Sequence, residues 1–377
     1  MPPRGNSRRT SEREQVRYAV VGLGHIAQVA VLPAFRHARR NSELAALVSG
    51  SRLKLSRLQQ KYQVPYAVEY DQYEELLQRG DIDAVYIALP NDLHYEYTLR
   101  AAAMGVHVLC EKPLALREQD CEEMIRATRD AGVRLMTAYR LHYDEATLDA
   151  LQLVRSGRIG EPRLFTSLLT MQVKDRENVR LDAERGGGPL WDLGVYCINA
   201  ARSLFGDEPV MVEGLDAGRG ERFREVPEMS TGLLRFPRER LALFGCSFGA
   251  ADASMYQVIG TKGDLKVEPA FEYAEGLGHR VTINGRTRRR SYPKRDQFGA
   301  ELLAFSDCVI EGRDPEPSGV EGLADVRVIG ALIRSAMEGR AITLPPARRA
   351  QRPDPDQEIR LPPVRPPREV AARSPSG

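Results

Sequence analysis

The stretch Arg17-Tyr-Ala-Val-Val-Gly-Leu-Gly-His-Ile-Ala27 decides the fold of this chain. Its residues 18–21 are an unbroken apolar run, as expected for a strand that is buried on both faces of a parallel sheet. The run leads into the pattern G-x-G-x-x-G/A, with alanine in the third place. In this pattern Gly22 permits a tight turn, Gly24 lets the backbone approach a pyrophosphate, and Ala27 keeps helix and strand close together. The stretch therefore predicts a dinucleotide-binding turn.

The residues after the second glycine complete this predicted phosphate site. A helix is expected from Ile26 to about Arg39, and the amide groups at its start, at His25 and Ile26, face the phosphates. A glycine pattern alone is a weak signal. This one follows a strand and precedes a helix, which is the context that the mechanism requires.

The loop after the second predicted strand, Glu43–Val48, indicates which dinucleotide binds. An NAD enzyme usually ends this strand with Asp or Glu, which holds the ribose hydroxyls. This chain has no carboxylate there and offers hydroxyls and cations instead, at Ser49, Ser51, Arg52 and Lys54. Such groups favour a phosphate through charge-assisted hydrogen bonds. The loop predicts NADP, although its residues also fit an ordinary exposed loop before a helix.

A third predicted strand, Ala84–Leu89, ends in a polar turn. In open α/β sheets, ligands bind at the carboxyl ends of the strands, so this turn borders the predicted cofactor crevice. Its candidate contacts are Pro90, Asn91 and His94. His94 alone fits a structural or capping role better than a catalytic one, because strand-end loops carry many polar residues.

The strand in His107–Leu114 ends in Glu111-Lys112-Pro113. Lys112 would leave a buried strand directly into the crevice, and Pro113 restricts its backbone to an extended conformation. An ammonium group beside a redox cofactor can polarise a substrate hydroxyl or carbonyl. The alternative is a solvated lysine at a strand end. We predict that Lys112 acts on substrate and that Glu111 lies beside the cofactor.

Strands and helices alternate regularly up to the strand Arg134–Ala138. This alternation predicts a doubly wound parallel sheet, so that residues 16–140 form a Rossmann NADP-binding domain. The chain is long enough for a second domain, at residues 141–345. Residues 1–15 are polar and expected to be mobile, and the Pro/Arg-rich residues 346–377 are expected to be a disordered tail.

Composition excludes several classes of protein. The net charge of +2, with both signs interspersed over 377 residues, does not suggest a nucleic-acid partner. No apolar run is long enough to span a membrane. The five cysteines are scattered without C-x-x-C spacing, which argues against a disulfide framework or a zinc site. We expect a cytoplasmic protein without a bound metal.

A later predicted helix, Leu190–Leu204, carries a polar stripe. Asp192, Tyr196 and Asn199 are spaced by four and three residues, so they share one face. Such a stripe on an otherwise apolar helix is either exposed or part of a site. Gly186-Gly-Gly188 precedes the helix and permits either close approach of the backbone to a ligand or flexibility.

Several of these motifs together resemble the Gfo/Idh/MocA oxidoreductase family, and most closely its glucose–fructose oxidoreductase branch. The motifs are Gly22–Ala27, Glu111-Lys112-Pro113, Tyr139-Arg140 with His142, Tyr143 and Asp144, and Gly186–Asn199, within a similarity that covers about residues 16–345. In that branch Ser49 and Lys54 fit a loop pattern that implies NADP. Many family members have histidine at the position of Tyr196, whereas the branch has tyrosine. The resemblance implies that the second domain, 141–345, binds substrate and mediates oligomerisation. It also implies that this domain has a mostly antiparallel, open-faced sheet that often packs against another subunit.

The resemblance also implies roles for individual residues. Lys112 and Tyr196 flank the reacting sugar carbon, and Asp192 orients the sugar hydroxyls. Further pocket contacts are expected from Arg140, which also borders the cofactor, and from Arg180.

The strand and turn signals of the second half agree with this architecture. The segments Arg163–Met171, Met229–Phe236, Leu241–Phe248 and Tyr256–Gly260 have the β-branched and aromatic content of strands. Asn284-Gly285 indicates a hairpin turn. Because few helices are expected after residue 205 to cover the sheet, we predict a homodimer or homotetramer.

We therefore predict an NADP-dependent sugar oxidoreductase that transfers hydride between nicotinamide and a ring carbon of a sugar. A first alternative is a keto-sugar reductase, or an enzyme that cycles a tightly held NADP between two sugars. An alternative of another class is a nucleotide-binding regulator that has lost turnover. For the proton transfer, Tyr196 is predicted to be the base, with its anion stabilised by Lys112. Alternatively, Lys112 itself carries the proton and Tyr196 positions the sugar.

Overall fold

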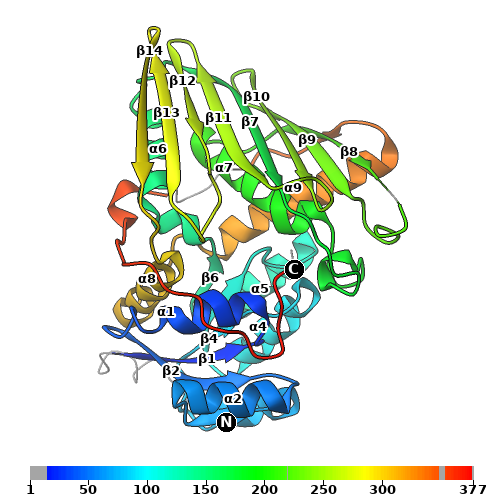
Figure 1. The fold of residues 1–377 in the computed structure, drawn as a ribbon. Helices are drawn as coiled ribbons and strands as arrows, with labels where there is room; N and C mark the ends of the chain where they lie inside the picture. Colours follow the sequence, from blue (N-terminus) through cyan, green and yellow to red (C-terminus); the bar gives the residue numbers. More distant parts are fainter. Residues whose placement is uncertain (1–14, 219, 348–352, 376–377) are drawn as a thin grey trace.

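The computed structural model describes residues 15–218, 220–347 and 353–375. The first domain lies at the bottom of Figure 1 and the second domain, built on a large sheet, lies above it. The predicted mobile N-terminal segment falls outside the described residues except for Gln15. Within the described ranges, no helix is long and apolar enough to cross a membrane.

The first sheet has six strands, all parallel, in the order β3-β2-β1-β4-β5-β6. This is the strand order of a Rossmann fold, and it confirms the predicted fold class. The sequence pattern missed β3, which has only three residues. The strands are β1 (Val16–Val21), β2 (Ser42–Val48), β3 (Tyr66–Val68), β4 (Ala84–Ile87), β5 (His107–Glu111) and β6 (Leu135–Ala138).

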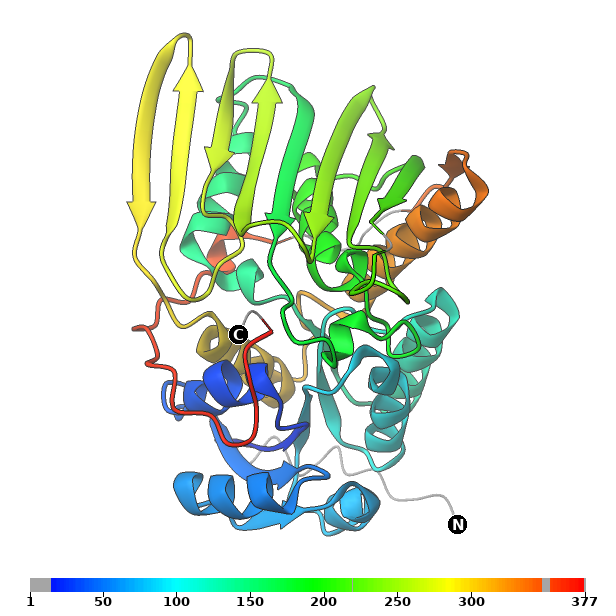
Figure 2. The same cartoon turned by 45° about the vertical axis from the view of Figure 1, so that its right-hand side comes forward.

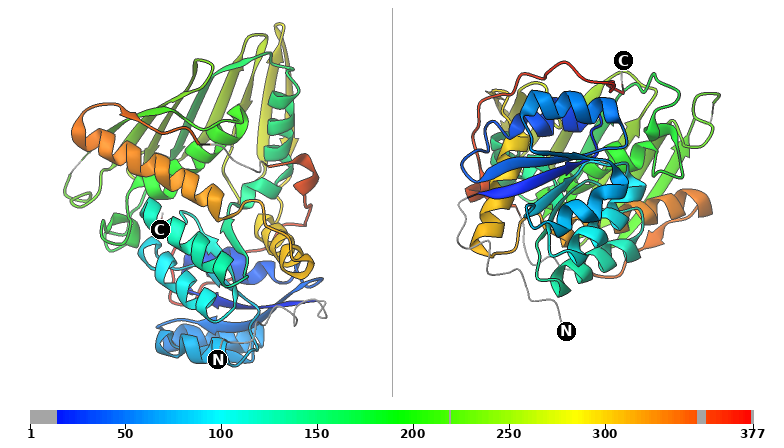
Figure 3. Two further views of the ribbon diagram at one scale, coloured as in Figure 1. Left: turned by 180° about the vertical axis from the view of Figure 1, so that it is seen from behind. Right: turned by 90° about the horizontal axis from the view of Figure 1, so that it is seen from below.

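Helices cover both faces of this sheet, as Figure 3 shows from below. They are the π-helical turn η2 (Ala27–Val31), α1 (Leu32–Ala34), α2 (Arg52–Tyr62), α3 (Tyr73–Gln78), α4 (His94–Ala103) and α5 (Glu118–Asp130). The dinucleotide helix is shorter than predicted, since α1 ends at Ala34 rather than near Arg39. Pro33 has no amide hydrogen to donate to the preceding turn, and that turn, Ala27–Val31, is π-helical rather than α-helical.

The second sheet has nine strands in the order β14-β13-β12-β11-β7-β10-β9-β8-β15. Only the β7–β10 pair is parallel, so the prediction of a mostly antiparallel sheet is confirmed. Asn284 and Gly285 connect β13 and β14 with positive φ angles of 49° and 75°, as a tight hairpin turn requires. The strands are β7 (Pro162–Thr170), β8 (Met211–Ala217), β9 (Met229–Phe236), β10 (Arg240–Ser247), β11 (Ala253–Gly260), β12 (Gly263–Val267), β13 (Leu277–Ile283), β14 (Arg286–Tyr292) and β15 (Ile342–Thr343).

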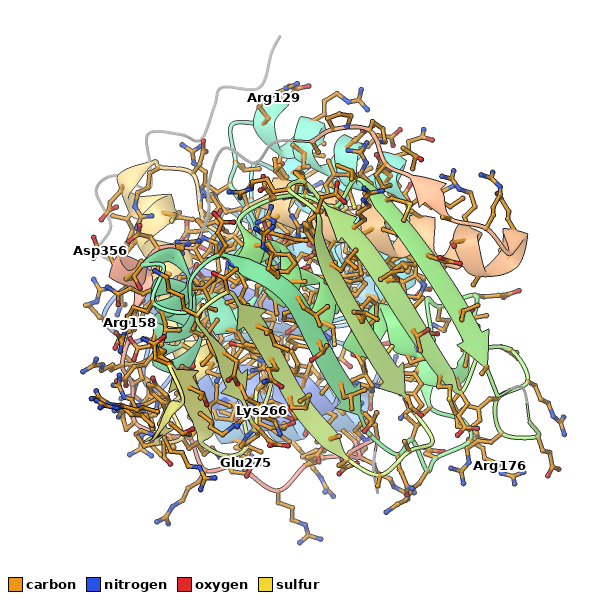
Figure 4. The ribbon with its side chains drawn as sticks, turned by 90° about the horizontal axis from the view of Figure 1, so that it is seen from above. Arg129, Arg158, Arg176, Lys266, Glu275 and Asp356 are labelled. Carbon is orange, nitrogen blue, oxygen red and sulfur yellow. The ribbon has the colours of Figure 1, made fainter. Side chains whose placement is uncertain are left out.

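Helices pack on one face of the second sheet and leave the other face open (Figures 1 and 3). The covering elements are α6 (Glu145–Arg155), the π-helical turn η7 (Leu190–Gly194), α7 (Val195–Phe205) and α9 (Gly319–Glu338). The open face carries exposed apolar side chains on neighbouring strands, among them Leu168, Leu215 and Leu243 with 48%, 67% and 42% exposure. Figure 4 looks onto this sheet from above, with Lys266 labelled on β12.

One helix of the predicted second domain packs on the first. Helix α8 (Gln297–Glu311) lies against the Rossmann sheet, where the Tyr18 hydroxyl and Ser306 Oγ are 2.7 Å apart in the core. Asn41 Nδ2 also donates to the carbonyl of Leu303 over 2.9 Å. The first structural unit therefore includes more than residues 16–140, because the chain returns to it after β14 to form α8.

The C-terminal segment differs from the prediction of a disordered tail. Residues 353–375 lie along the molecule and hydrogen-bond to it, whereas residues 348–352 and 376–377 are outside the described part. The Ile359 amide donates to the Tyr143 carbonyl over 3.2 Å, and the Asp296 amide donates to the Leu361 carbonyl over 3.4 Å. Ile359, Leu361 and Val370 pack against the core of the first domain. Composition suggested disorder because apolar residues are few, but these three are spaced so that each reaches the body of the protein.

Candidate active site

The glycine-rich loop has the shape that a diphosphate requires. Gly22 has a φ of +94°, and a Cβ there would lie 2.5 Å from the carbonyl oxygen of Ala88, so a side chain is excluded. At Gly24 the opposite holds, since a Cβ would meet no atom within 4 Å. Ala27 is fully buried against the sheet. The open space above Gly24, at the start of η2, fits the phosphates of a dinucleotide.

The four residues predicted to contact the phosphate in the loop after β2 differ in their surroundings. Ser49 is buried, and Ser51 caps α2 by accepting from the Lys54 amide over 3.4 Å. Arg52 is exposed and pairs with Glu69 over 2.5 Å. Lys54 is partly buried, and burial lowers the pKa of its ammonium while the nearby charge of Glu369 opposes this shift. Lys54 is therefore a better candidate for a ribose phosphate than Arg52.

The turn after β4 serves mainly to connect the loops of the crevice. His94 is fully buried, with Nδ1 2.8 Å from the carbonyl oxygen of Pro113 and Nε2 2.9 Å from that of Leu89. Burial lowers the pKa of this imidazole. Because both ring nitrogens are engaged, His94 ties the exits of β4 and β5 together and does not point at a cofactor. Pro90 precedes the short turn Asn91–Leu93 that leads into α4.

The three consecutive glycines allow close contact between backbones. Asn91 Nδ2 donates to the carbonyl of Gly186 over 2.8 Å, which joins the first domain to the loop before η7. A Cβ at Gly187 would lie 2.5 Å from the carbonyl oxygen of Arg180. The amide of Gly188 donates to that same carbonyl over 2.8 Å. The sequence left two interpretations of these glycines, flexibility or close approach of the backbone to a ligand. The glycines do allow close approach, but the group they approach is the backbone of the protein itself.

Lys112, Asp192 and Arg180 form an ion triad at the end of β5. Lys112 Nζ donates to Asp192 Oδ1 over 3.0 Å and to the Asp192 carbonyl over 3.0 Å, and Arg180 Nε donates to Oδ2 over 2.6 Å. Burial alone would raise the pKa of Asp192, but the charges of Arg180 and Lys112 hold it below its ordinary value. Burial likewise would lower the pKa of Lys112, but Asp192 and Tyr196 outweigh it and the pKa is raised. Lys112 therefore carries its proton at neutral pH.

Tyr196 lies between two cations. Lys112 Nζ lies over the Tyr196 ring, 4.6 Å from its centroid. Arg140 Nη2 donates to the Tyr196 hydroxyl over 3.3 Å and to the carbonyl of Phe271 over 2.6 Å, and Nη1 donates to Gln297. Arg140 is 5% exposed. Its contacts are with the protein, so it positions Tyr196 instead of reaching outward to a ligand.

A buried carboxyl group, Glu301, and a half-buried one, Glu111, lie close together beside the same tyrosine hydroxyl. The Tyr86 hydroxyl donates to Glu111 Oε1 over 2.8 Å and lies 3.4 Å from Glu301 Oε2. Burial, together with the negative charge of Glu111, raises the pKa of Glu301 well above its ordinary value, and Glu301 is fully buried. Sequence analysis missed Glu301. The available signal was that Glu301 interrupts the mostly apolar run 298–305 of this helix.

The third member of the polar stripe belongs to a different cluster. Asn199 is buried; its Oδ1 accepts from His142 Nε2 over 2.9 Å, and its Nδ2 donates to Glu321 and Asp325 over 2.8 Å each. The Tyr139 hydroxyl and Arg202 also bind Asp325. This buried network joins the end of β6 to α7 and α9, and so it fixes α7 relative to the first domain.

Comparison with known proteins gives matches over both domains. A model described as "Oxidoreductase family, NAD-binding Rossmann fold" matches residues 16–139, and a model of the "GFO/IDH/MocA C-terminal domain" matches residues 147–266. The NADP-dependent D-xylose 1-dehydrogenase of Haloarcula marismortui is 31% identical over 334 residues, which are 87% of this chain and 92% of that protein.

Solved structures are similar over most of their length. The aldose–aldose oxidoreductase of Caulobacter crescentus, complexed with glycerol, is 37% identical with a TM-score of 0.83, and the match covers 88% of this chain and all of that one (100%). A 3-ketoreductase from Actinomadura kijaniata, in complex with NADP and TDP-benzene, is 28% identical with a TM-score of 0.79 over 85% of this chain and 98% of that one.

Proposed function

Because the chain belongs to the Gfo/Idh/MocA oxidoreductase family, we propose that it is an NADP-dependent sugar oxidoreductase. It transfers hydride between nicotinamide and a ring carbon of a small sugar. Its similarity to the NADP-dependent xylose dehydrogenase and to the aldose–aldose oxidoreductase supports both the cofactor and the substrate class. The cysteines are buried and unpaired, which supports a cytoplasmic location.

The proposal rests on one observation: Lys112, Asp192 and Tyr196 lie close together at the carboxyl end of β5. They come from two domains, yet Lys112 contacts both of the others. The same edge of the sheet carries the glycine loop, where the space above Gly24 fits a dinucleotide. NADP supplies the hydride acceptor or donor when it is bound. A regulator without turnover would not require this ion triad beside a tyrosine.

The protein's own residues handle the substrate proton. Oxidation of a carbinol requires its hydroxyl proton to leave, and we assign Tyr196 as the base that takes it. Arg140 donates to the Tyr196 hydroxyl and the ammonium of Lys112 lies over the ring, so the two cations hold the hydroxyl in position. Since Lys112 stays protonated, it serves as a hydrogen-bond donor to the substrate oxygen. Asp192 and Arg180 position Lys112 and border the sugar.

The test is a panel of aldoses and related polyols, offered with NADP and with NAD in parallel while reduced nicotinamide is followed by absorbance. We expect turnover of at least one sugar and faster reaction with NADP. A chain that binds NADP but turns over none of the panel would contradict the proposed activity.

The second candidate is exchange of hydride between two aldoses while NADP stays bound. The similarity to the aldose–aldose oxidoreductase favours it. In this case one sugar alone would reduce bound NADP once, and adding a second sugar would reoxidise it without free cofactor.

A further inference from the structure

Residues 368–375, the last described stretch of the chain, cross from the glycine-rich loop to the second domain. We call this stretch the strap. In Figure 1 the C-terminal segment, in red, runs across the front of α1, and in Figure 2 its end lies in front of the junction of the two domains. The strap lies outside the residues that the two family models match.

The first attachment of the strap is to the loop predicted to hold the phosphates. Glu369 Oε2 is 2.9 Å from Nδ1 of His25, which directly follows Gly24. The carboxylate of Glu369 also lies close enough to Lys54 to affect the pKa of its ammonium. One strap side chain thus reaches both regions assigned to the phosphates of NADP.

The second attachment is to the buried side chain of Gln28. Gln28 is 1% exposed, although glutamine is polar and the neighbouring residues of η2 are apolar. Its Nε2 donates to the carbonyls of Leu23 and Val370 over 2.9 and 3.0 Å, and its Oε1 accepts from the Val370 amide over 2.7 Å. The side-chain amide of Gln28 therefore binds the strap backbone through both of its polar atoms. A buried amide without these partners would cost stability, so the strap is part of the folded structure.

The third attachment is in the second domain. The amide of Lys174 donates to the carbonyl of Pro375 over 3.1 Å, and Pro375 is buried. Lys174 is in the loop after β7 that also carries Arg180 of the ion triad. Val370 and Pro375 are five residues apart, so the link between the two attachments spans at most about 18 Å. While both ends are bound, the two domains cannot move far apart on this side.

We propose that the strap is a gate for the cofactor: it must release His25 and Gln28 before NADP can enter or leave the site. This inference rests on the proposed function. A closed strap slows both binding and release, which favours retention of NADP through successive turnovers. It also supports the second candidate function, in which one bound NADP serves two sugars.

The experiment compares the full chain with a variant that ends at Pro367. The variant lacks the strap but keeps the preceding tail contacts of Gln357, Ile359 and Leu361. Bound NADPH is followed by its fluorescence in stopped flow, with release measured by chasing with excess NADP. We expect release to be at least tenfold faster in the shortened chain and association to be faster as well.

Point variants separate the gate from a general loss of structure. Val370→Pro removes the amide that donates to Gln28 and should speed release in the full-length chain. Glu358→Gln is the matched control in the same tail, because Glu358 pairs with Arg360 and is away from the glycine loop. It should release NADPH at the native rate.

A separate measurement needs no cofactor. Hydrogen exchange of the Val370 amide should be slow in the full-length chain, since that amide is hydrogen-bonded to Gln28. Exchange at the rate of an unstructured peptide would overturn the proposal, as would equal release rates in the full and shortened chains when both bind NADPH tightly. If neither chain binds NADPH, the proposed function itself is wrong.

Discussion

The ammonium of Lys112 faces the ring of Tyr196, 4.6 Å from its centroid, and the cation at the tyrosine hydroxyl is Arg140. The sequence led us to expect Lys112 as the stabilising charge. In the structure two cations contact Tyr196: a lysine that also binds Asp192, and an arginine that is buried. A cation over the face of an aromatic ring is attracted by its quadrupole, so Lys112 also holds the ring in place.

Replacing Tyr196 by phenylalanine tests the assignment of the base. Tyr196→Phe should lower kcat by about 10²–10⁴ with a nearly unchanged KM, as for loss of a general base. Steady-state kinetics on the best sugar will measure this. Tyr256→Phe is the control, because Tyr256 is buried nearby against Phe271 and its hydroxyl is not part of the site. Near-native kcat with a raised KM for Tyr196→Phe would leave only a positioning role.

Lys54 should decide the choice of cofactor. Loss of one charge-assisted phosphate contact costs about 1.5–3 kcal/mol, so Lys54→Ala should weaken NADP by roughly one to two decades and leave NAD nearly unchanged. Titration of protein fluorescence with each cofactor measures both affinities. Arg52→Ala should have a smaller effect because its guanidinium binds Glu69, and the exposed Arg57 offers a further control on α2. An equal loss for NADP and NAD would contradict the assignment.

Asp192 should contribute stability that depends on pH. Its pKa is depressed in the folded protein, so its stabilising effect is fully present above the unfolded value of about 3.9 and is lost as pH falls below that value toward the lower folded pKa. At pH 7, Asp192→Asn should cost roughly 2 kcal/mol, less than a fully buried pair because Asp192 is 21% exposed. Urea unfolding at several pH values should show the difference from wild type shrinking at low pH. Asp175→Asn, in the exposed loop before Arg180, is the control.

Glu301 should have the opposite pH dependence. Its pKa is raised by burial, so the folded protein keeps a proton that the unfolded chain loses above about pH 4.3. Native stability therefore falls as pH rises, by up to about 1.4 kcal/mol per pH unit until the folded pKa is reached. Glu301→Gln removes this pH dependence, so the stability of the variant relative to the wild type should increase as pH rises. Glu311→Gln, exposed at the end of the same helix, should not show the trend.

The open face of the second sheet should be an interface between copies of this chain. Leu243 is 42% exposed in the middle of that face, and Leu241 and Leu168 are exposed on the same strand pair. Light scattering coupled to size-exclusion chromatography should show a dimer or tetramer for the native chain and a smaller species for Leu243→Asp. Met337→Asp, at an 81% exposed position on α9, is the control. A native monomer at micromolar concentration would refute the predicted assembly.

Local patterns predicted much of the fold and part of the site. Short apolar runs predicted every strand of the first sheet except the three-residue β3, the glycines predicted the phosphate loop, and Asn284-Gly285 predicted a hairpin. The proximity of Lys112 to the helix with Asp192 and Tyr196 followed from the family resemblance. These signals are local in sequence or shared by related proteins, so they can be recognised before the structure is known.

Other features depend on contacts between distant parts of the chain. For His94 the sequence favoured a structural role over a catalytic one but also offered a cofactor contact; its two carbonyl partners come from separate loops and hold it inward. Arg140 is directed at Tyr196 by Gln297 and Phe271, more than a hundred residues away. The docking of the tail depends on a buried glutamine at position 28. Composition and periodicity carry no information about such pairings.

The return of α8 to the first sheet has a consequence for biosynthesis. Tyr18, Asn41 and Ser42 are buried and hydrogen-bond to residues 302–307 of that helix. As the chain leaves the ribosome, the strands that carry the nucleotide loop are made first, but the helix that covers them follows some 250 residues later. Until α8 is made, Tyr18, Asn41 and Ser42 lack these hydrogen-bond partners. The two domains therefore mature together, and a fragment ending near residue 140 would lack part of its own core.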